Sequence, residues 1–140
     1  MEASQILFIV DSAPFILAGG LHAALALYDA VNPTFFTSVQ RSAAVAMERA
    51  KLAFAPSVQM FRAWIGFNVS HGVGLLVFGL FVLLLAALDF GAFRDTAVLM
   101  PLSIGVGLTY MALAIRFWFW VPLVATAFGT ACFAVGWALA

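Results

Sequence analysis

Four long apolar stretches constrain the fold of this chain more than any other feature. They cover residues 4–28, 63–88, 96–115 and 119–140. Each reaches the roughly 20 residues that an α-helix needs to cross a bilayer. Charged residues make up 9% of the chain and hydrophobic residues 66%, whereas soluble domains carry about 25% charged residues. The sequence therefore predicts an all-α, polytopic membrane protein with four transmembrane helices.

The basic residues predict how the chain crosses the membrane. The second connection holds Arg94 alone, and the other five basic residues lie in the first and third connections: Arg41, Arg49, Lys51, Arg62 and Arg116. Lys and Arg concentrate in cytoplasmic connections, so both termini are expected outside, on the periplasmic side. Short connections make consecutive helices antiparallel neighbours, which predicts a single-domain, up-down four-helix bundle.

The first connection, residues 29–62, is the only long one. An alanine-rich stretch predicts a helix over residues 38–55, ended by Pro56. One interpretation places this helix on the cytoplasmic membrane surface, with its basic residues near lipid phosphates. The alternative is a lid over a site between the spans.

A layer of polar side chains is expected inside the membrane. Counted at about 1.5 Å per residue, His22, His71, Tyr110 and Thr126 fall at similar depths in the four spans, and Asn68 lies one turn closer to the cytoplasm. Lipid offers no hydrogen bonds, so each of these groups needs a partner or a task.

Two interpretations of this layer stay open. The side chains could hydrogen-bond to one another and fix the packing of the helices. Alternatively they could bind a cofactor: His22 and His71 as axial ligands of a b-type haem, or the layer as a site for a quinone or a lipid. A metal site is less well supported, because zinc takes three or four ligands and Cys132 lies too near the outer end of its span.

Small residues occur on two sides of the second span and predict close helix contacts. Gly72 and Gly79 share a face with Asn68, whereas the opposite face carries a ridge of residues four apart: Gly66, Ser70 and Gly74. The second span is therefore expected to be the central helix of the bundle, or to meet another subunit as well.

Asp11 interrupts the first apolar stretch in its outer half. It would lie near the outer boundary if the span starts late. An intramembrane carboxylate is also the usual device of a small proton-coupled transporter, which makes transport a further alternative function.

The run RAWIGFNVSHG, residues 62–72, resembles the hallmark of a family of small bacterial four-span integral membrane proteins whose function is uncharacterised. Phe78 and Gly79 follow at the spacing of that family, and His22, Met47, Pro122 and the Arg116–Phe119 turn also match it. Gly72 departs from it, because the family often has a second serine there. The resemblance implies a four-span fold and no activity.

These observations favour a non-enzymatic protein that acts by helix packing. No recognisable catalytic set is present, and the net charge of zero offers no basic patch for nucleic acid. The leading hypothesis is an accessory or structural subunit of a larger bacterial inner-membrane complex. Its partners would be the lipid bilayer and other membrane subunits, or further copies of the chain.

Overall fold

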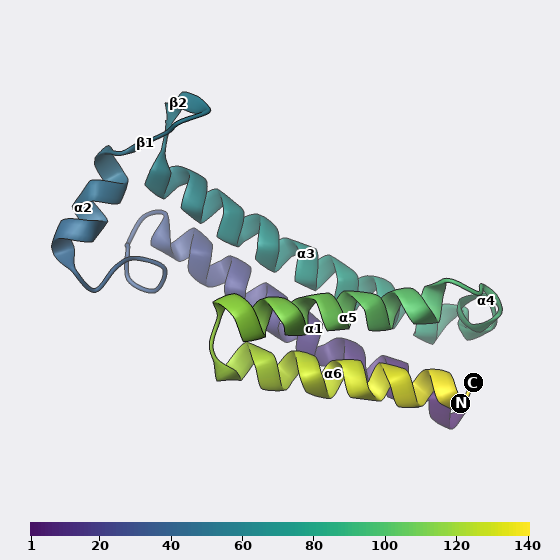
Figure 1. The fold of residues 1–140 in the computed structure, drawn as a ribbon. Coiled ribbons are helices and arrows are strands. Elements are labelled where there is room, and N and C mark those ends of the chain that lie inside the picture. Colours follow the sequence, from purple (N-terminus) through teal and green to yellow (C-terminus); the bar gives the residue numbers. More distant parts are fainter. The chain divides into compact units, whose positions relative to one another are not determined.

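Six helices and one small hairpin make up the chain (Figure 1). The computed structural model describes all 140 residues, of which 78% are helical. The elements are, in order, α1 (Ala3–Asp29), α2 (Arg41–Arg49), β1 (Lys51–Leu52), β2 (Ala55–Gln59), α3 (Met60–Leu88), α4 (Phe90–Asp95), α5 (Leu99–Phe117) and α6 (Trp120–Ala138).

Four of the helices are long and apolar enough to cross a membrane: α1, α3, α5 and α6. They confirm the four predicted spans, with ends that differ by a few residues. Only 22–33% of the residues in their most apolar windows are buried within the protein. Soluble proteins do not leave so much apolar surface exposed, so the outward faces of these helices suit contact with lipid.

The first connection differs from its prediction. The helix expected over residues 38–55 is present only as α2, Arg41–Arg49, and the predicted length was wrong. The following residues pair instead as antiparallel strands, with Lys51 opposite Gln59. The helix ends at Arg49, and Ala50 already has extended backbone. Pro56 accounts only for Ala55, because the residue before a proline is driven toward extended backbone, and Ala55 accordingly begins β2.

The second connection contains a short helix that the sequence analysis did not predict. The Asp89 side chain accepts a hydrogen bond from the Ala92 N–H at 2.9 Å and so caps the N-terminus of α4. Aspartate is among the best residues at this position. Asp89 therefore indicated a helix start, but the segment was too short for a helix to be predicted from its apolar residues.

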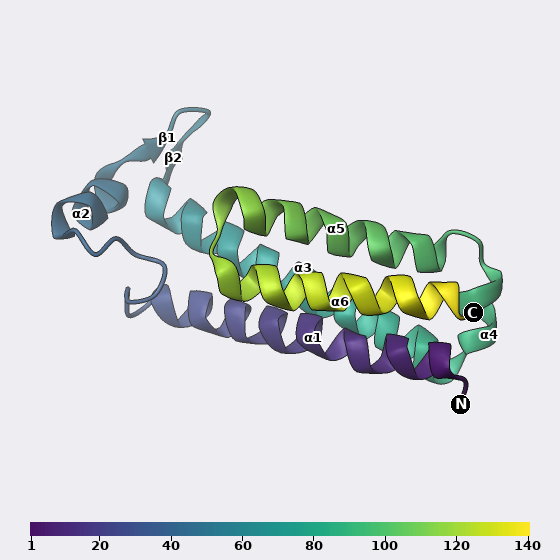
Figure 2. The ribbon, with the colours of Figure 1, turned by 60° about the horizontal axis from the view of Figure 1, so that its bottom comes forward.

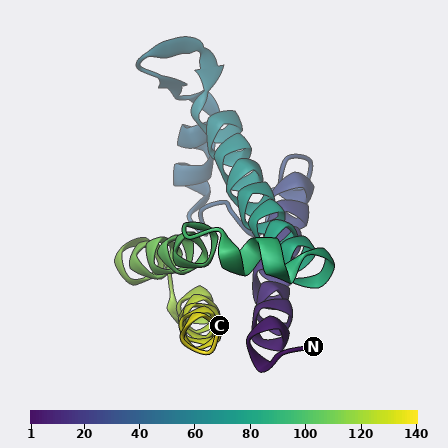
Figure 3. The ribbon, with the colours of Figure 1, turned by 90° about the vertical axis from the view of Figure 1, so that its right-hand side faces the viewer.

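Contacts within the chain group into two compact units. The first unit comprises residues 1–18 and 75–140, and the second comprises residues 19–74. In the first unit, α5 and α6 lie side by side and antiparallel, joined by a tight turn at Trp118 and Phe119 (Figure 2). Viewed along the helices, α5, α6 and the N-terminal part of α1 form separate neighbouring coils (Figure 3).

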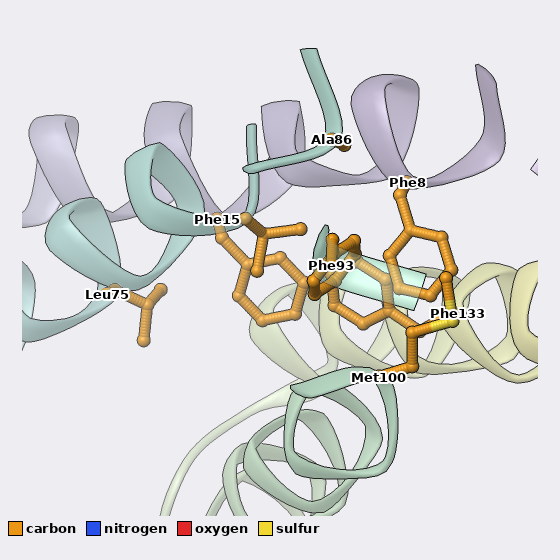
Figure 4. Close-up of a cluster of buried hydrophobic side chains, with 8 residues drawn as sticks. Phe8, Phe15, Leu75, Ala86, Phe93, Met100 and Phe133 are labelled. Atoms are coloured by element: carbon orange, nitrogen blue, oxygen red, sulfur yellow. The ribbon is translucent and has the colours of Figure 1, made fainter. Parts of the chain in front are cut away.

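Aromatic rings fill the core of the first unit (Figure 4). The Phe133 ring of α6 stacks against two rings of α1, with centroid distances of 5.3 Å to Phe8 and 5.6 Å to Phe15. Glycines on α6 make room for these rings. A Cβ at Gly136 would come within 2.8 Å of the Phe8 ring, and one at Gly129 within 2.7 Å of the Phe15 ring.

Two side chains near the N-terminus tie α1 to the ends of other helices in the first unit. The Ser4 hydroxyl donates to the Gly136 carbonyl at 2.7 Å, and the Gln5 amide donates to the Ala86 carbonyl at 2.9 Å. Carbonyls in the last turn of a helix lack a partner within that helix. These bonds therefore fix α1 against α6 and α3 where the helices themselves leave acceptors open.

Replacing Phe133 with alanine should lower the free energy of unfolding by roughly 3–5 kcal/mol, because the substitution leaves a cavity between two rings. Phe128→Ala is the matched control, since Phe128 is on the same helix and is 56% exposed. Denaturation in detergent, followed by circular dichroism, measures both variants. Equal losses of stability would show that the stacked rings of Phe8, Phe15 and Phe133 are not the core of this unit.

Candidate functional site

Three of the five predicted polar side chains come together in the second unit. His22 lies on α1, and Asn68 and His71 lie one turn apart on α3, so both face the same part of α1. The His22 Nε2 atom is 3.3 Å from the Asn68 Oδ1 atom. The His22 and His71 rings are in edge contact, with centroids 5.2 Å apart and planes at 67°.

Both the oxygen and the nitrogen of the Asn68 side-chain amide are hydrogen-bonded. Its Nδ2 group donates to the Trp64 carbonyl at 2.8 Å, which leaves Oδ1 as the acceptor for His22. His22 therefore donates from Nε2, and this sets its tautomer when the ring is neutral. Asn68 is 7% exposed, and buried polar groups are costly unless they are hydrogen-bonded in this way.

Gly72 brings the two helices together beside this cluster. A Cβ at this position would lie 2.6 Å from the Ala23 nitrogen and 2.9 Å from the Gly19 carbonyl oxygen. Such distances are shorter than any normal contact, so only glycine allows this approach of the two backbones. The face predicted from Asn68 and Gly72 is thus the one that packs against α1. Gly79 does the same in the first unit, where a Cβ would meet Ile16.

The segment after α1 is folded back by Asp29. This side chain is fully buried and accepts hydrogen bonds from three successive backbone N–H groups, those of Thr34, Phe35 and Phe36. A carboxylate that receives several N–H groups is well stabilised as an anion. Asp29 therefore gives the start of the long connection a defined shape.

Phe36 covers the edge of the polar cluster as a result. The centroids of the Phe36 and His22 rings are 4.8 Å apart. The Phe36 carbonyl accepts a hydrogen bond from the Trp64 indole at 2.8 Å. Phe36 and Trp64 were not predicted from the sequence as part of the site, and Phe36 precedes the helix over residues 38–55 for which a lid was considered. A signal was available in Trp64, because an indole N–H near a membrane surface needs an acceptor.

Tyr110 belongs to α5 in the first unit, where it packs against the aromatic core. Thr126 belongs to α6 in the same unit, and its hydroxyl donates to the Pro122 carbonyl of its own helix. The predicted layer of five polar residues therefore stays a prediction as a whole, and the cluster described here consists of His22, Asn68 and His71.

This geometry does not fit a haem held between His22 and His71. Two axial ligands point ring nitrogens at one iron from opposite faces of a flat macrocycle. Here the two rings contact each other, and the donor nitrogen of His22 is engaged by Asn68. The space at Gly72 is filled by the α1 backbone. No three His, Cys, Asp or Glu side chains gather to form a metal site. The arrangement favours hydrogen bonding between α1 and α3.

The other side of α3 is open. Gly66, Ser70 and Gly74 are all exposed, and a Cβ at Gly66 would meet nothing within 4 Å. Beside the ridge runs a groove of about 620 Å³, lined by Leu27, Ala30, Phe61, Arg62, Ile65, Gly66, Val69, Ser70 and Val73. The predicted ridge of small residues thus borders an apolar groove within the second unit.

No known family, curated protein or solved structure matches this chain. The resemblance carried by residues 62–72 stays a prediction. Within that run, Trp64, Asn68 and Gly72 make the contacts just described, so the motif has a structural explanation in this chain.

Gly72→Ala should lower the free energy of unfolding by roughly 1–3 kcal/mol, because the added methyl group forces two backbones apart. Gly20→Ala is the control, since a Cβ there meets nothing within 4 Å. It should be neutral or stabilising, by up to about 1 kcal/mol. Reversible denaturation in detergent measures both. An unchanged Gly72→Ala protein would contradict the close approach of α1 and α3.

The hydrogen bond between His22 and Asn68 should give a favourable coupling energy of about 0.6 kcal/mol, a typical value between membrane helices. A double-mutant cycle of His22→Ala and Asn68→Ala, measured by denaturation in detergent, yields this energy. Additive losses of stability would mean that the bond contributes nothing to packing.

Proposed function

We propose that this chain is an integral membrane accessory subunit that acts by packing a helix against another membrane subunit. The observation that carries the proposal is the exposed ridge of Gly66, Ser70 and Gly74 on α3. Small residues four apart let two helix backbones approach closely, and this is the main device of helix association in lipid. The opposite face of α3 already packs against α1 through Gly72.

The groove beside the ridge supports a helix as the occupant. Its lining is almost entirely apolar side chains from α1 and α3, with Arg62 as its one charged residue. Interhelical contact in lipid depends on shape and close packing rather than on charge. A second helix seated on Gly66 and Ser70 would place its side chains in this groove and cover the open side of α3.

The proposal includes a topology. Four helices run up and down as a bundle in a bacterial inner membrane, with both termini on the periplasmic side. The support is the distribution of Lys and Arg, which places the α2 and hairpin segment in the cytoplasm. Arg62 then lies at the cytoplasmic boundary, where its charge can stay near lipid headgroups.

The role of the histidine cluster follows from this function. His22, Asn68 and Gly72 hold α3 against α1 in one fixed orientation, and α3 can then present its ridge outward. On this proposal the polar cluster is a packing element, and the partner subunit binds on the other side of the helix.

Gly66→Leu should abolish association with the partner while leaving the chain folded, because the new side chain fills the ridge and its Cβ meets nothing within 4 Å in its own chain. Gly105→Leu is the matched control, since Gly105 is also an exposed helical glycine with nothing within 4 Å. Association is measured in native membranes by crosslinking from Ser70→Cys in a Cys132→Ser background, with mass analysis of the product.

A crosslink that Gly66→Leu removes and Gly105→Leu keeps supports the proposal. A product that contains only a second copy of the chain would contradict an accessory role and make the ridge a self-interface. A monomer without any product from Ser70→Cys would remove the basis of the proposal.

A further inference from the structure

Asp11 is the one buried side chain in this protein whose polar atoms lack a partner. It is 0% exposed, and neither carboxyl oxygen has a hydrogen bond. Asp29, on the same helix, is also 0% exposed but receives three backbone N–H groups. Burial alone therefore does not distinguish the two carboxyl groups. The difference is that Asp29 receives well-formed hydrogen bonds, whereas the Phe133 backbone N–H near Asp11 does not reach hydrogen-bond geometry.

The surroundings of Asp11 are aromatic rings and backbone. Phe8 and Phe15 flank it one turn away on each side, and Phe133 stacks on both of their rings (Figure 4). On α6, a Cβ at Gly129 would come 3.4 Å from the Asp11 Oδ1 atom. The carboxyl group is thus enclosed between α1 and α6 in the first unit.

No cation is available to Asp11 from the helices of this unit. The titratable groups are Cys132 on α6 and the half-buried Tyr110 on α5, and residues 75–88 of α3 carry none. The two cations lie elsewhere: Arg94 is exposed and pairs with Glu2 and Asp95, and Arg116 is exposed beside the Phe117 ring. An unpaired carboxylate in such surroundings costs so much free energy that the group takes up a proton instead.

A small cavity in the same unit shares one side chain, Phe15, with the surroundings of Asp11. It has a volume of about 30 Å³ and is lined by Pro14, Phe15, Ala18, Leu75, Trp118, Pro122, Ala125 and Thr126. This lining is apolar except for Thr126, whose hydroxyl donates to its own helix, so the cavity is packing space rather than a water site. The Phe15 ring forms part of the cavity wall. It also lies against Gly129 of α6, the residue that faces the Asp11 carboxyl group. Phe15 is therefore the side chain shared by the cavity and the carboxyl site.

We propose that Asp11 is a proton-binding site within the membrane, protonated in the folded protein and exchanging its proton with solvent water when the Phe15 ring moves aside. The ligand is a single proton, taken up by one carboxylate oxygen to give the neutral acid. This site lies in the first unit and is independent of the packing surface on α3.

Infrared spectroscopy of the purified protein in lipid tests the protonation state. Wild-type protein should show the carbonyl band of a protonated carboxyl group, and Asp11→Asn should lose it. Asp29→Asn should keep the band, because the proposal assigns it to Asp11, whereas Asp29 accepts hydrogen bonds from backbone N–H groups. If Asp11→Asn removes no such band, the proposal is wrong.

Isotope labelling keeps the test decisive should Asp11→Asn fail to fold. Wild-type protein with carboxyl-¹³C aspartate should show the same band moved to lower frequency. A band that does not move belongs to another residue type and overturns the assignment, as does the absence of any band.

Transfer into D₂O tests the route of exchange. The band should shift as the proton is replaced by a deuteron, and the shift should be several-fold faster in Phe15→Leu than in wild-type protein. Phe8→Leu is the matched control, because Phe8 stacks on the same Phe133 ring but does not line the cavity. Equal acceleration in both variants, or none in Phe15→Leu, would overturn the route.

Discussion

The close approach of helix backbones at glycines is the constraint on which the rest of this structure depends. In each unit α1 meets a partner helix where that helix has no side chain: Gly72 in the second unit, and Gly129 and Gly136 in the first. Lipid gives apolar helices no hydrophobic reason to associate, so van der Waals contact at short range has to hold them. The aromatic column of Phe8, Phe15 and Phe133 fits only because the facing glycines leave room for its rings.

Hydrogen bonds contribute to this packing less than the sequence analysis anticipated. Several buried hydroxyl groups turn back to carbonyls of their own helix: Ser12, Ser103, Thr126 and Thr130. Such local bonds satisfy a polar group without joining two helices. The bonds that do join helices are few, and Ser4, Gln5 and the pair of His22 with Asn68 supply them. Shape complementarity therefore decides which helices are neighbours.

The sequence predicted the helices well and their contacts only in part. Length and hydropathy located four spans, because a bilayer imposes both on any helix that crosses it. The shorter α2 and the extra α4 were missed, since the extended backbone at Ala50 and the Asp89 cap are local features that a count of apolar residues does not register. His22, Asn68 and Gly72 were found because their types and spacing are unusual in an apolar helix. The contact of Phe36 with the cluster was not predicted, because it depends on a loop conformation that the hydrogen bonds to Asp29 set.

The order of synthesis gives the contact between α1 and α6 a particular consequence. Asp11 and Phe8 leave the ribosome more than a hundred residues before Phe133 and Gly136. At typical rates of elongation that interval is on the order of ten seconds. During it α1 has no α6 to cover its carboxyl group, so the nascent chain carries Asp11 without this shield. The contact between α1 and α6 can form only after the last helix is made, and burial of this carboxyl group is therefore a late step of folding.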